Sequence, residues 1–176
     1  VALCAAIISL GALGIDTMLP ALPAIGTRLG AATAADWPLV ITAFLLGFGI
    51  AQPIHGPLAD RFGRRPVLIV ALAIYALTNL IATAAGSFAL LLAARFVGGL
   101  AVASARVVPV AMVRDLHAGR AMARVTSLIF MVFMIIPVIA PSLGQLVLLF
   151  GEWHSIFLVM AGIATAITLW AFIRMP

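Results

Sequence analysis

The sequence predicts an all-α membrane protein with six transmembrane helices. Of its 176 residues, 65% are hydrophobic and only 9% are charged, whereas soluble domains average about 25% charged residues. Four stretches carry no acid or base, at residues 37–59, 66–94, 125–151 and 153–173. Each is long enough to cross a bilayer core as a helix, and none shows the alternation of a membrane barrel strand. The composition therefore excludes a soluble enzyme, a disordered chain and a secreted disulfide scaffold.

Hydropathy places the helices, all in a single transmembrane bundle, at residues 1–24, 36–54, 66–85, 88–113, 122–150 and 153–173. The first helix holds an acidic residue and two prolines. The second and third flank an arginine-rich loop, and a short turn with Ser87 separates the third from the fourth. A second arginine-rich loop precedes the fifth helix, and Glu152 marks the turn before the sixth. Because both ends of the chain lie next to apolar runs, we expect a fragment of a longer protein.

The distribution of arginine predicts how the helices are oriented. Loops on one side of the expected bundle carry most of the basic residues, namely Arg61, Arg64, Arg65, Arg114, Arg120, Arg124 and Arg174. The opposite side carries Arg28 with two acids, Asp36 and Glu152. Cytoplasmic loops are enriched in basic residues, so we expect the start of the first helix and the end of the sixth in the cytoplasm. The same rule explains the net charge of +5 without a nucleic-acid partner.

Asp16 most needs an explanation, because a carboxylate inside an apolar span is costly unless it is protonated, hydrated or paired. It lies about eight residues, roughly 12 Å of helix rise, from the outer end of its predicted helix. Arg95 lies at a similar depth in the fourth helix, so the two could pair directly or through water. One interpretation is a static ion pair. The interpretation that we favour is a site for a proton or a cationic substrate, because intramembrane acids usually line transport pathways.

Other polar residues in the spans allow two interpretations each. Arg106 lies eleven residues after Arg95, and at about 100° per residue the two share one helix face, which could line a polar cavity. Arg106 could equally extend its side chain to the cytoplasmic interface. Gln52 is either an interhelical hydrogen-bond partner or a contact for substrate. The sequence has no nucleophile–base pair, phosphate-binding loop or metal-ligand pattern, so we expect neither an enzyme nor a metal or cofactor site.

The loop after the second predicted helix carries an ordered pattern, G-P-L-A-D-R-F-G-R-R-P over residues 56–66. Its glycines, acid and arginines are Gly56, Asp60, Arg61, Gly63, Arg64 and Arg65. The glycines permit sharp changes of chain direction. The aspartate can form charge-assisted contacts with the arginines or with exposed helix ends. A positively charged cytoplasmic loop would explain the arginines, but it would not explain the order of the whole pattern.

This pattern resembles the G-x-L-a-D-r-x-G-r-k/r signature between helices two and three of the major facilitator superfamily. Further segments resemble the Bcr/CflA group of drug:proton antiporters in that superfamily. Residues 16–23 look like the group's D-M-Y-L-P-A-L-P stretch, residues 95–99 like the helix-four R-F-x-x-G motif, and residues 113–116 like its V-R-D-L ending. Residues 140–144 resemble the antiporter motif of helix five, and residues 153–157 the start of helix six. The resemblance covers essentially the whole chain.

The resemblance implies the N-terminal six-helix bundle of a twelve-helix major facilitator fold, with the substrate site between two bundles at mid-membrane. It implies a proton-coupled multidrug efflux antiporter of the bacterial inner membrane, which exports hydrophobic or cationic small molecules by alternating access and needs no cofactor. By this resemblance, Asp16 would bind the proton or cation, and Arg95 would take part in proton coupling. The loop motif and Asp115 would form a cytoplasmic latch to the C-terminal half. Pro141 and Gly144 would shape helix five so that the pathway does not leak.

The chain departs from the family pattern at several positions. Gln145 replaces the second glycine of the usual helix-five pair, Thr17-Met18 replaces M-Y, and Arg106 and Pro109 are additional features of helix four. These departures bear on substrate identity more than on the class of protein. Two alternatives stay open, a major facilitator carrier for a specific metabolite and a non-transporting membrane assembly module. A substrate panel would test the first, and the presence of a second six-helix half in the parent chain would argue against the second.

Overall fold

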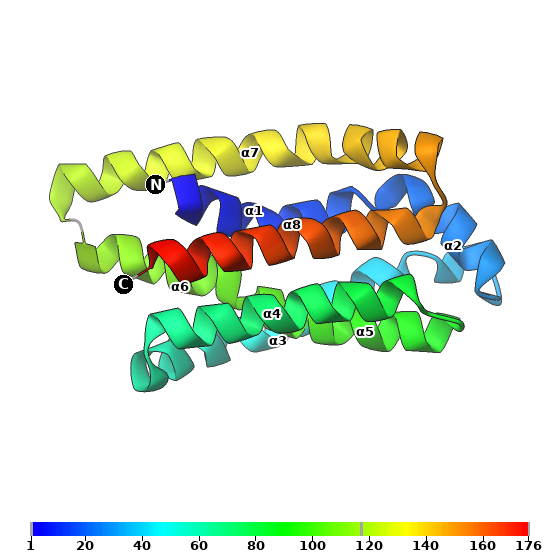
Figure 1. Ribbon diagram of the computed structural model, residues 1–176, viewed down its shortest axis with the longest axis horizontal. Helices are drawn as coiled ribbons and strands as arrows, with labels where there is room; N and C mark the ends of the chain where they lie inside the picture. Colours follow the sequence, from blue (N-terminus) through cyan, green and yellow to red (C-terminus); the bar gives the residue numbers. More distant parts are fainter. Residues whose placement is uncertain (1, 117, 176) are drawn as a thin grey trace.

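The computed structural model describes residues 2–116 and 118–175, and within them every regular element is helical. Six antiparallel spans lie along the long axis of the molecule (Figure 1), which confirms the predicted all-α class. The spans are α1 (Ala2–Asp16), η1 (Leu19–Ala21) and α2 (Leu22–Arg28); η2 (Ala34–Asp36) and α3 (Leu39–Phe62); α4 (Arg64–Thr83); α5 (Phe88–Val102) and α6 (Ser104–Leu116); α7 (Gly119–Phe150); and α8 (Trp153–Arg174). The two termini lie at the same end of the bundle (Figure 1), as an even number of crossings requires.

The first span is interrupted, although the sequence predicted one continuous helix over residues 1–24. α1 ends at Asp16, and the chain resumes as η1 and α2 after two non-helical residues. Pro20 lacks the N–H that would bond to the carbonyl of Asp16, and Pro23 lacks the one that would bond to Leu19. The prolines therefore place a break in the helix directly at its acidic residue. This consequence of the spacing between Asp16 and Pro20 was missed in the sequence analysis.

The second span is longer than the hydropathy predicted, because α3 continues through Pro53 and Pro57 to Phe62. α4 begins at Arg64, so most of the predicted loop is helical and Gly63 alone joins the two helices. Gly63 has a φ of +91°, a backbone region that glycine adopts far more readily than other residues. Charged residues lowered the hydropathy of the last turns of α3 without ending the helix, which is why the predicted boundary at residue 54 was too early.

The fourth span is also interrupted, with Ala103 between α5 and α6. The expectation that Arg95 and Arg106 share one helix face stays a prediction, but the two side chains differ in exposure. Arg95 on α5 is only 3% exposed, whereas Arg106 on α6 is exposed. The two arginines therefore lie in different surroundings, one inside the bundle and one at its edge.

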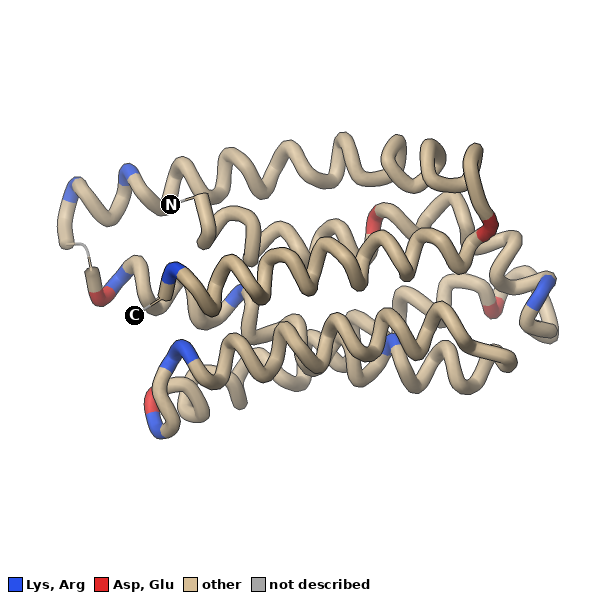
Figure 2. Tube along the Cα trace, in the orientation of Figure 1, with Lys and Arg blue, Asp and Glu red and all other residues tan. Residues whose placement is uncertain are grey.

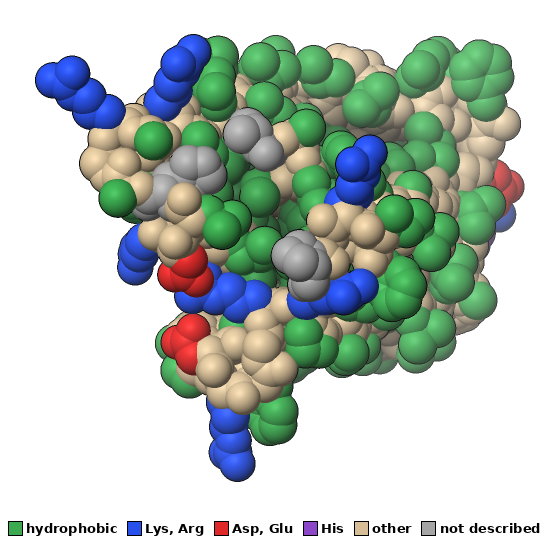
Figure 3. All heavy atoms as spheres, turned by 60° about the vertical axis from the view of Figure 1, so that its left-hand side comes forward, with side chains coloured by type: hydrophobic (Ala, Val, Ile, Leu, Met, Phe, Trp, Pro, Cys, Tyr) green, Lys and Arg blue, Asp and Glu red, His purple; other side chains and the backbone are tan. Residues whose placement is uncertain are grey.

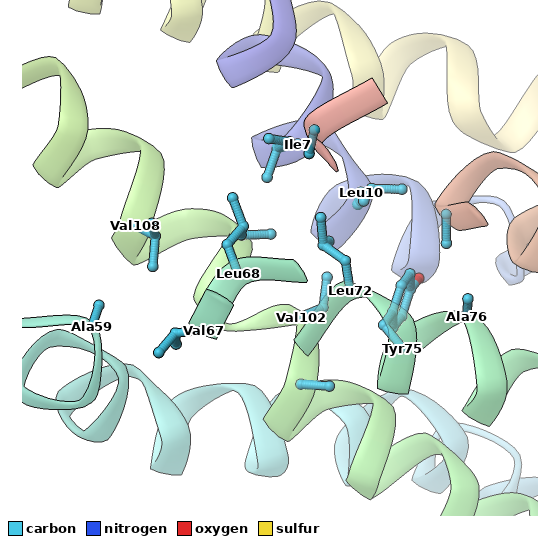
Figure 4. Packing of buried hydrophobic residues seen from close by; sticks show 14 of the residues in the cluster. Ile7, Leu10, Ala59, Val67, Leu68, Leu72, Tyr75, Ala76, Val102 and Val108 are labelled. Atoms are coloured by element: carbon cyan, nitrogen blue, oxygen red, sulfur yellow. The ribbon is translucent and has the colours of Figure 1, made fainter. Parts of the chain in front are cut away.

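The largest core cluster joins α1, α4, α5 and α6, as Figure 4 shows for Ile7, Leu72, Val102 and Val108, and residues of α3 and α8 contribute to it. Close contact between α3 and α5 depends on two glycines. A Cβ added at Gly47 would collide with the backbone carbonyl of Phe96, and one at Gly99 would collide with that of Phe44. Small residues let membrane helices approach closely in this way.

Charged residues gather at the two ends of the bundle, and few lie along its middle (Figure 2). In Figure 3, arginine and acidic side chains cover the end where the two termini lie, and hydrophobic side chains cover the flanks. The most apolar part of α7 is less buried than the corresponding part of any other span, and that of the second span is the next least buried. The six spans are thus apolar on the outside along their length, as a bilayer requires.

Candidate functional site

Arg95 lies inside the bundle, where α5 brings it against α1, α3 and α8. Its Nη2 donates a hydrogen bond to the carbonyl oxygen of Gly14 over 2.6 Å. Its guanidinium carbon lies 4.1 Å from the ring centroid of Phe44 and 5.9 Å from that of Phe157. Aromatic faces attract a cation at such distances. A buried arginine is therefore stabilised here by one charge-assisted hydrogen bond and two aromatic rings.

Two polar residues of α4 lie beside this arginine site. Tyr75 is fully buried, and a Cβ added at Gly14 would collide with its hydroxyl group. Asn79 is also buried, and its Nδ2 donates to the carbonyl oxygen of Tyr75 over 2.8 Å. The absence of a side chain at Gly14 therefore makes room for the hydroxyl of Tyr75. A functional role for Tyr75 was not predicted, because one tyrosine within an apolar span forms no pattern.

Asp16 lies at the end of α1, half-buried, and lines a cavity of about 220 Å³. The cavity is bordered by residues of α1, α3, α5, α6 and α7, among them Gly11, Ile15, Phe48, Val102, Arg106, Phe133 and Pro137. Among the described residues, Asp16 takes part in no ion pair. A carboxylate beside a cavity and without a cationic partner can bind a proton or a cationic group.

The direct pair between Asp16 and Arg95, which their similar depths suggested, is not formed. Arg95 contacts Gly14 instead, two residues earlier on α1. Two residues turn an α-helix by about 200°, so Asp16 lies on nearly the opposite side of α1 from the carbonyl that Arg95 reaches. Two residues at similar depths in the membrane meet only if their side chains also point toward each other around their helix axes.

The loop motif joins four helices at the end of the bundle where the termini lie. Arg64, the first residue of α4, places Nη1 2.5 Å from Asp115 of α6 and Nη2 3.7 Å from Asp60 of α3. Arg65 donates a hydrogen bond over 2.8 Å to the carbonyl oxygen of Phe172 on α8. Arg61 lies with its guanidinium carbon 5.3 Å from the ring centroid of Phe62. The motif therefore ties α3, α4, α6 and α8 together within the bundle.

A second polar cavity, of about 570 Å³, opens beside this motif. It is lined by several of the predicted site residues, namely Gln52, Gly56, Asp60, Arg64, Arg106 and Asp115. Gly56 has open space around its Cβ position, so its lack of a side chain serves no close contact within the bundle. Arg106 borders both this cavity and the one that Asp16 lines.

The helix-five motif lies against the break in the first span. A Cβ added at Gly144 would collide with the carbonyl oxygen of Thr17, and it would lie 3.0 Å from Pro20. Pro141 stands one helical turn earlier on α7, where it removes a backbone hydrogen bond. Gly144 thus allows α7 to approach Thr17, directly after α1, and Pro20 of η1. No local sequence signal pointed to this contact, which joins distant parts of the chain.

An ion pair lies at the opposite end of the bundle. Arg28, the last residue of α2, places Nη2 3.6 Å from Oε1 of Glu152, just before α8. Both side chains are largely exposed, and exposed pairs contribute only about 0–1 kcal/mol. The pair marks a contact between the first and last spans and supplies little stability.

A comparison with models of protein families identifies the family of the chain. The model described as Major Facilitator Superfamily matches residues 2–176. The chain belongs to the major facilitator superfamily. The resemblance seen at the loop motif is thereby confirmed, and the protein is a multi-pass membrane protein of a transporter family.

Curated relatives within the superfamily include proteins named for drug resistance. Multidrug resistance protein MdtL of Klebsiella pneumoniae is 38% identical over 154 residues, which are 88% of this chain and 39% of that protein. The MdtL of a Shewanella species is 38% identical over 148 residues, 84% of this chain and 37% of the relative. The MFS-type transporter YdgK of Bacillus subtilis, described as uncharacterized, is 37% identical over 153 residues, 86% and 38% of the two chains. The chain thus spans about two fifths of the length of these relatives.

A solved structure shares the fold. The crystal structure of the human organic anion transporter MFSD10 (TETRAN) matches 99% of this chain with a TM-score of 0.79 at 21% sequence identity. The match covers 46% of that transporter. Six helices that match nearly half of a major facilitator structure agree with the predicted N-terminal bundle of a twelve-helix fold.

Proposed function

We propose that this chain is the N-terminal half of a multidrug efflux antiporter of the bacterial inner membrane, driven by the proton gradient. It exports hydrophobic or cationic small molecules by alternating access and needs no cofactor. The observation that carries the proposal is Asp16, an acid without an ion-pair partner in the described chain that lines a cavity at a helix break. The names of the bacterial MdtL relatives support drug efflux.

Asp16 carries the proton in this mechanism. When the cavity opens to the outside, the carboxylate takes up a proton and loses its attraction for a cationic substrate, which leaves. When the cavity opens to the cytoplasm, the proton dissociates and the carboxylate binds the next cation. The break after Asp16 and the two prolines that follow allow the outer part of the first span to move relative to α1.

Arg95 acts as a positioning residue beside this proton site. It holds the backbone of α1 through Gly14, two residues before Asp16, and it is itself fixed between Phe44 and Phe157. A change in the packing of α5 against α1 therefore moves Asp16 relative to the cavity. This link couples the protonation of Asp16 to the arrangement of the helices.

The loop motif works as the latch in the same proposal. Arg64 with Asp60 and Asp115 keeps three helices together, and the exposed Arg61 reaches the C-terminal half in one state of the cycle. The motif lies at the end that carries most of the arginines, which is the cytoplasmic end under the positive-inside rule. The start of the first span and the end of the sixth then face the cytoplasm.

The test uses the full-length protein in proteoliposomes, with a lipophilic cationic dye and a pH gradient that is imposed and then removed. We expect dye accumulation that depends on the gradient, and Asp16→Asn should reduce it at least tenfold. Asp36→Asn is the matched control, because Asp36 ends η2 outside the Asp16 cavity and, within the described residues, its carboxylate accepts hydrogen bonds from Thr33 alone. Asp16→Asn with undiminished gradient-driven transport would exclude the proton role. Transport of one metabolite from a substrate panel, without transport of dye, would instead identify a metabolite carrier.

A further inference from the structure

The cavity beside Asp16 holds a second, oppositely charged group. Arg106 of α6 and Asp16 of α1 both line it, and the rest of its wall is apolar or aromatic, including Phe48 and Phe133. In the part of the chain that the structure describes, no ion pair joins the two charges. A direct pair would cancel both charges, so the present arrangement leaves a cation-binding and an anion-binding group on one small cavity.

The position of Arg106 follows from the interrupted fourth span. The break at Ala103 separates Arg106 from the buried surroundings of Arg95, and α6 presents it at the edge of the bundle. Its guanidinium carbon lies 5.6 Å from the ring centroid of Phe133 on α7. An arginine could extend to the cytoplasmic interface, but this side chain borders the cavity of Asp16 as well as the cavity nearer the cytoplasmic latch.

We propose that Arg106 determines specificity by binding the anionic group of amphoteric substrates, whose cationic group binds Asp16. This inference rests on the proposed efflux function and names a substrate class for it. A guanidinium binds a carboxylate through two parallel charge-assisted hydrogen bonds, and the apolar and aromatic residues that line the same cavity suit an apolar body. The substrates expected are aromatic molecules that carry an ammonium or iminium group and a carboxylate.

The experiment compares two probes that differ only in this anionic group. One is a rhodamine methyl ester, which is a cation, and the other is the corresponding free acid, which also carries a carboxylate. Binding of each probe to the purified full-length protein is measured by fluorescence anisotropy. We expect Arg106→Ala to weaken binding of the acid at least tenfold and to change binding of the ester by less than twofold. Arg106→Lys, which keeps the charge but not the paired donors, should lie between.

Two further variants keep the test decisive. Arg124→Ala removes the same charge from α7, at an exposed position that does not line the cavity, and it should leave the ratio of the two affinities unchanged. Arg106→Gln preserves a long polar side chain without the charge, and it should reproduce the selective loss if Arg106→Ala does not fold. An acid-to-ester affinity ratio that stays at the wild-type value in both Arg106→Ala and Arg106→Gln would overturn the proposal. Failure of the wild-type protein to bind the acid would also overturn it.

Failure of this inference is distinguishable from failure of the proposed function. If the ester is pumped by a pH gradient but the affinity ratio does not respond to Arg106, the efflux function stands and the role of Arg106 falls. If the ratio responds but a pH gradient drives neither probe, Arg106 recognises the anionic group and the proposed energy source is wrong.

Discussion

The guanidinium of Arg95 donates a hydrogen bond to the carbonyl oxygen of Gly14 over 2.6 Å, and this contact joins α5 to α1 at a buried point. Glycine is required on α1 because the hydroxyl of Tyr75 occupies the space of a side chain there. The carboxylate of Asp16, two residues later, lines the cavity on the other side of α1. Arg95 thus uses a backbone acceptor of α1, and the acid of α1 lines the cavity.

Arg95→Ala should lower the melting temperature of the full-length protein more than Arg95→Lys does. The alanine variant loses a hydrogen bond from a charged donor, worth about 1.5–3 kcal/mol, and it also loses the contact with Phe44. A lysine can still donate to Gly14, but it lacks the planar group that lies over the ring. Thermal unfolding in detergent measures both variants. Equal melting temperatures for the two would contradict the geometry described for Arg95.

Gly47→Ala should destabilise the contact between α3 and α5, because its Cβ would meet the backbone of Phe96. Overpacking of this kind costs about 1–3 kcal/mol. Gly49→Ala is the matched control on the same helix, since its Cβ would enter open space. Thermal unfolding should show a clear loss for the first variant and none for the second. A similar response of both variants would mean that the two helices do not meet at Gly47.

Asp115→Asn should slow transport more than Asp60→Asn, because Arg64 lies 2.5 Å from Asp115 and 3.7 Å from Asp60. We expect a several-fold lower turnover with substrate affinity unchanged within twofold. The double variant Arg64→Asp with Asp115→Arg should recover part of the turnover, because the opposite charges are kept. A loss of substrate affinity that equals the loss of turnover would place these residues in the binding site instead.

Gly144→Ala should displace α7 from the break in the first span, since the added carbon would collide with the carbonyl of Thr17. We expect lower gradient-driven efflux and a faster proton leak through proteoliposomes that contain no substrate. Gly162→Ala on α8 is the control, because its Cβ would have open space around it. Unchanged leak and efflux in Gly144→Ala would show that the closeness of α7 to the break is dispensable.

The class of fold was predictable because the bilayer thickness sets the length of an apolar helix. Helix ends were less predictable where helices continue past the apolar region, as α3 does to Phe62. The helix breaks at Asp16 and Ala103 differ in how far the sequence predicts them. The first follows from Pro20 four residues later, so the sequence contains its cause, whereas no proline stands four residues after the second.

Residues close in sequence were easier to place than partners on different helices. Asp60 and Arg64 are only four residues apart in the sequence, so they stay close even though Gly63 separates their two helices. The family resemblance placed Asp115 in the latch to the C-terminal half, but it did not predict that Asp115 pairs with Arg64. The direct pair that the sequence allowed between Asp16 and Arg95 is not formed. Hydropathy gives depth in the membrane but not rotation about the helix axis, which side-chain packing decides.

Gly63 has a mechanical consequence as the only residue between α3, with 24 residues, and α4, with 20. Because the connection is a single residue, a tilt of one helix must move the adjoining end of the other. α4 is tied in turn to α6 by Arg64 and to α8 by Arg65. We therefore expect α3, α4, α6 and α8 to move as one rigid body, with the hinge at the break in the first span.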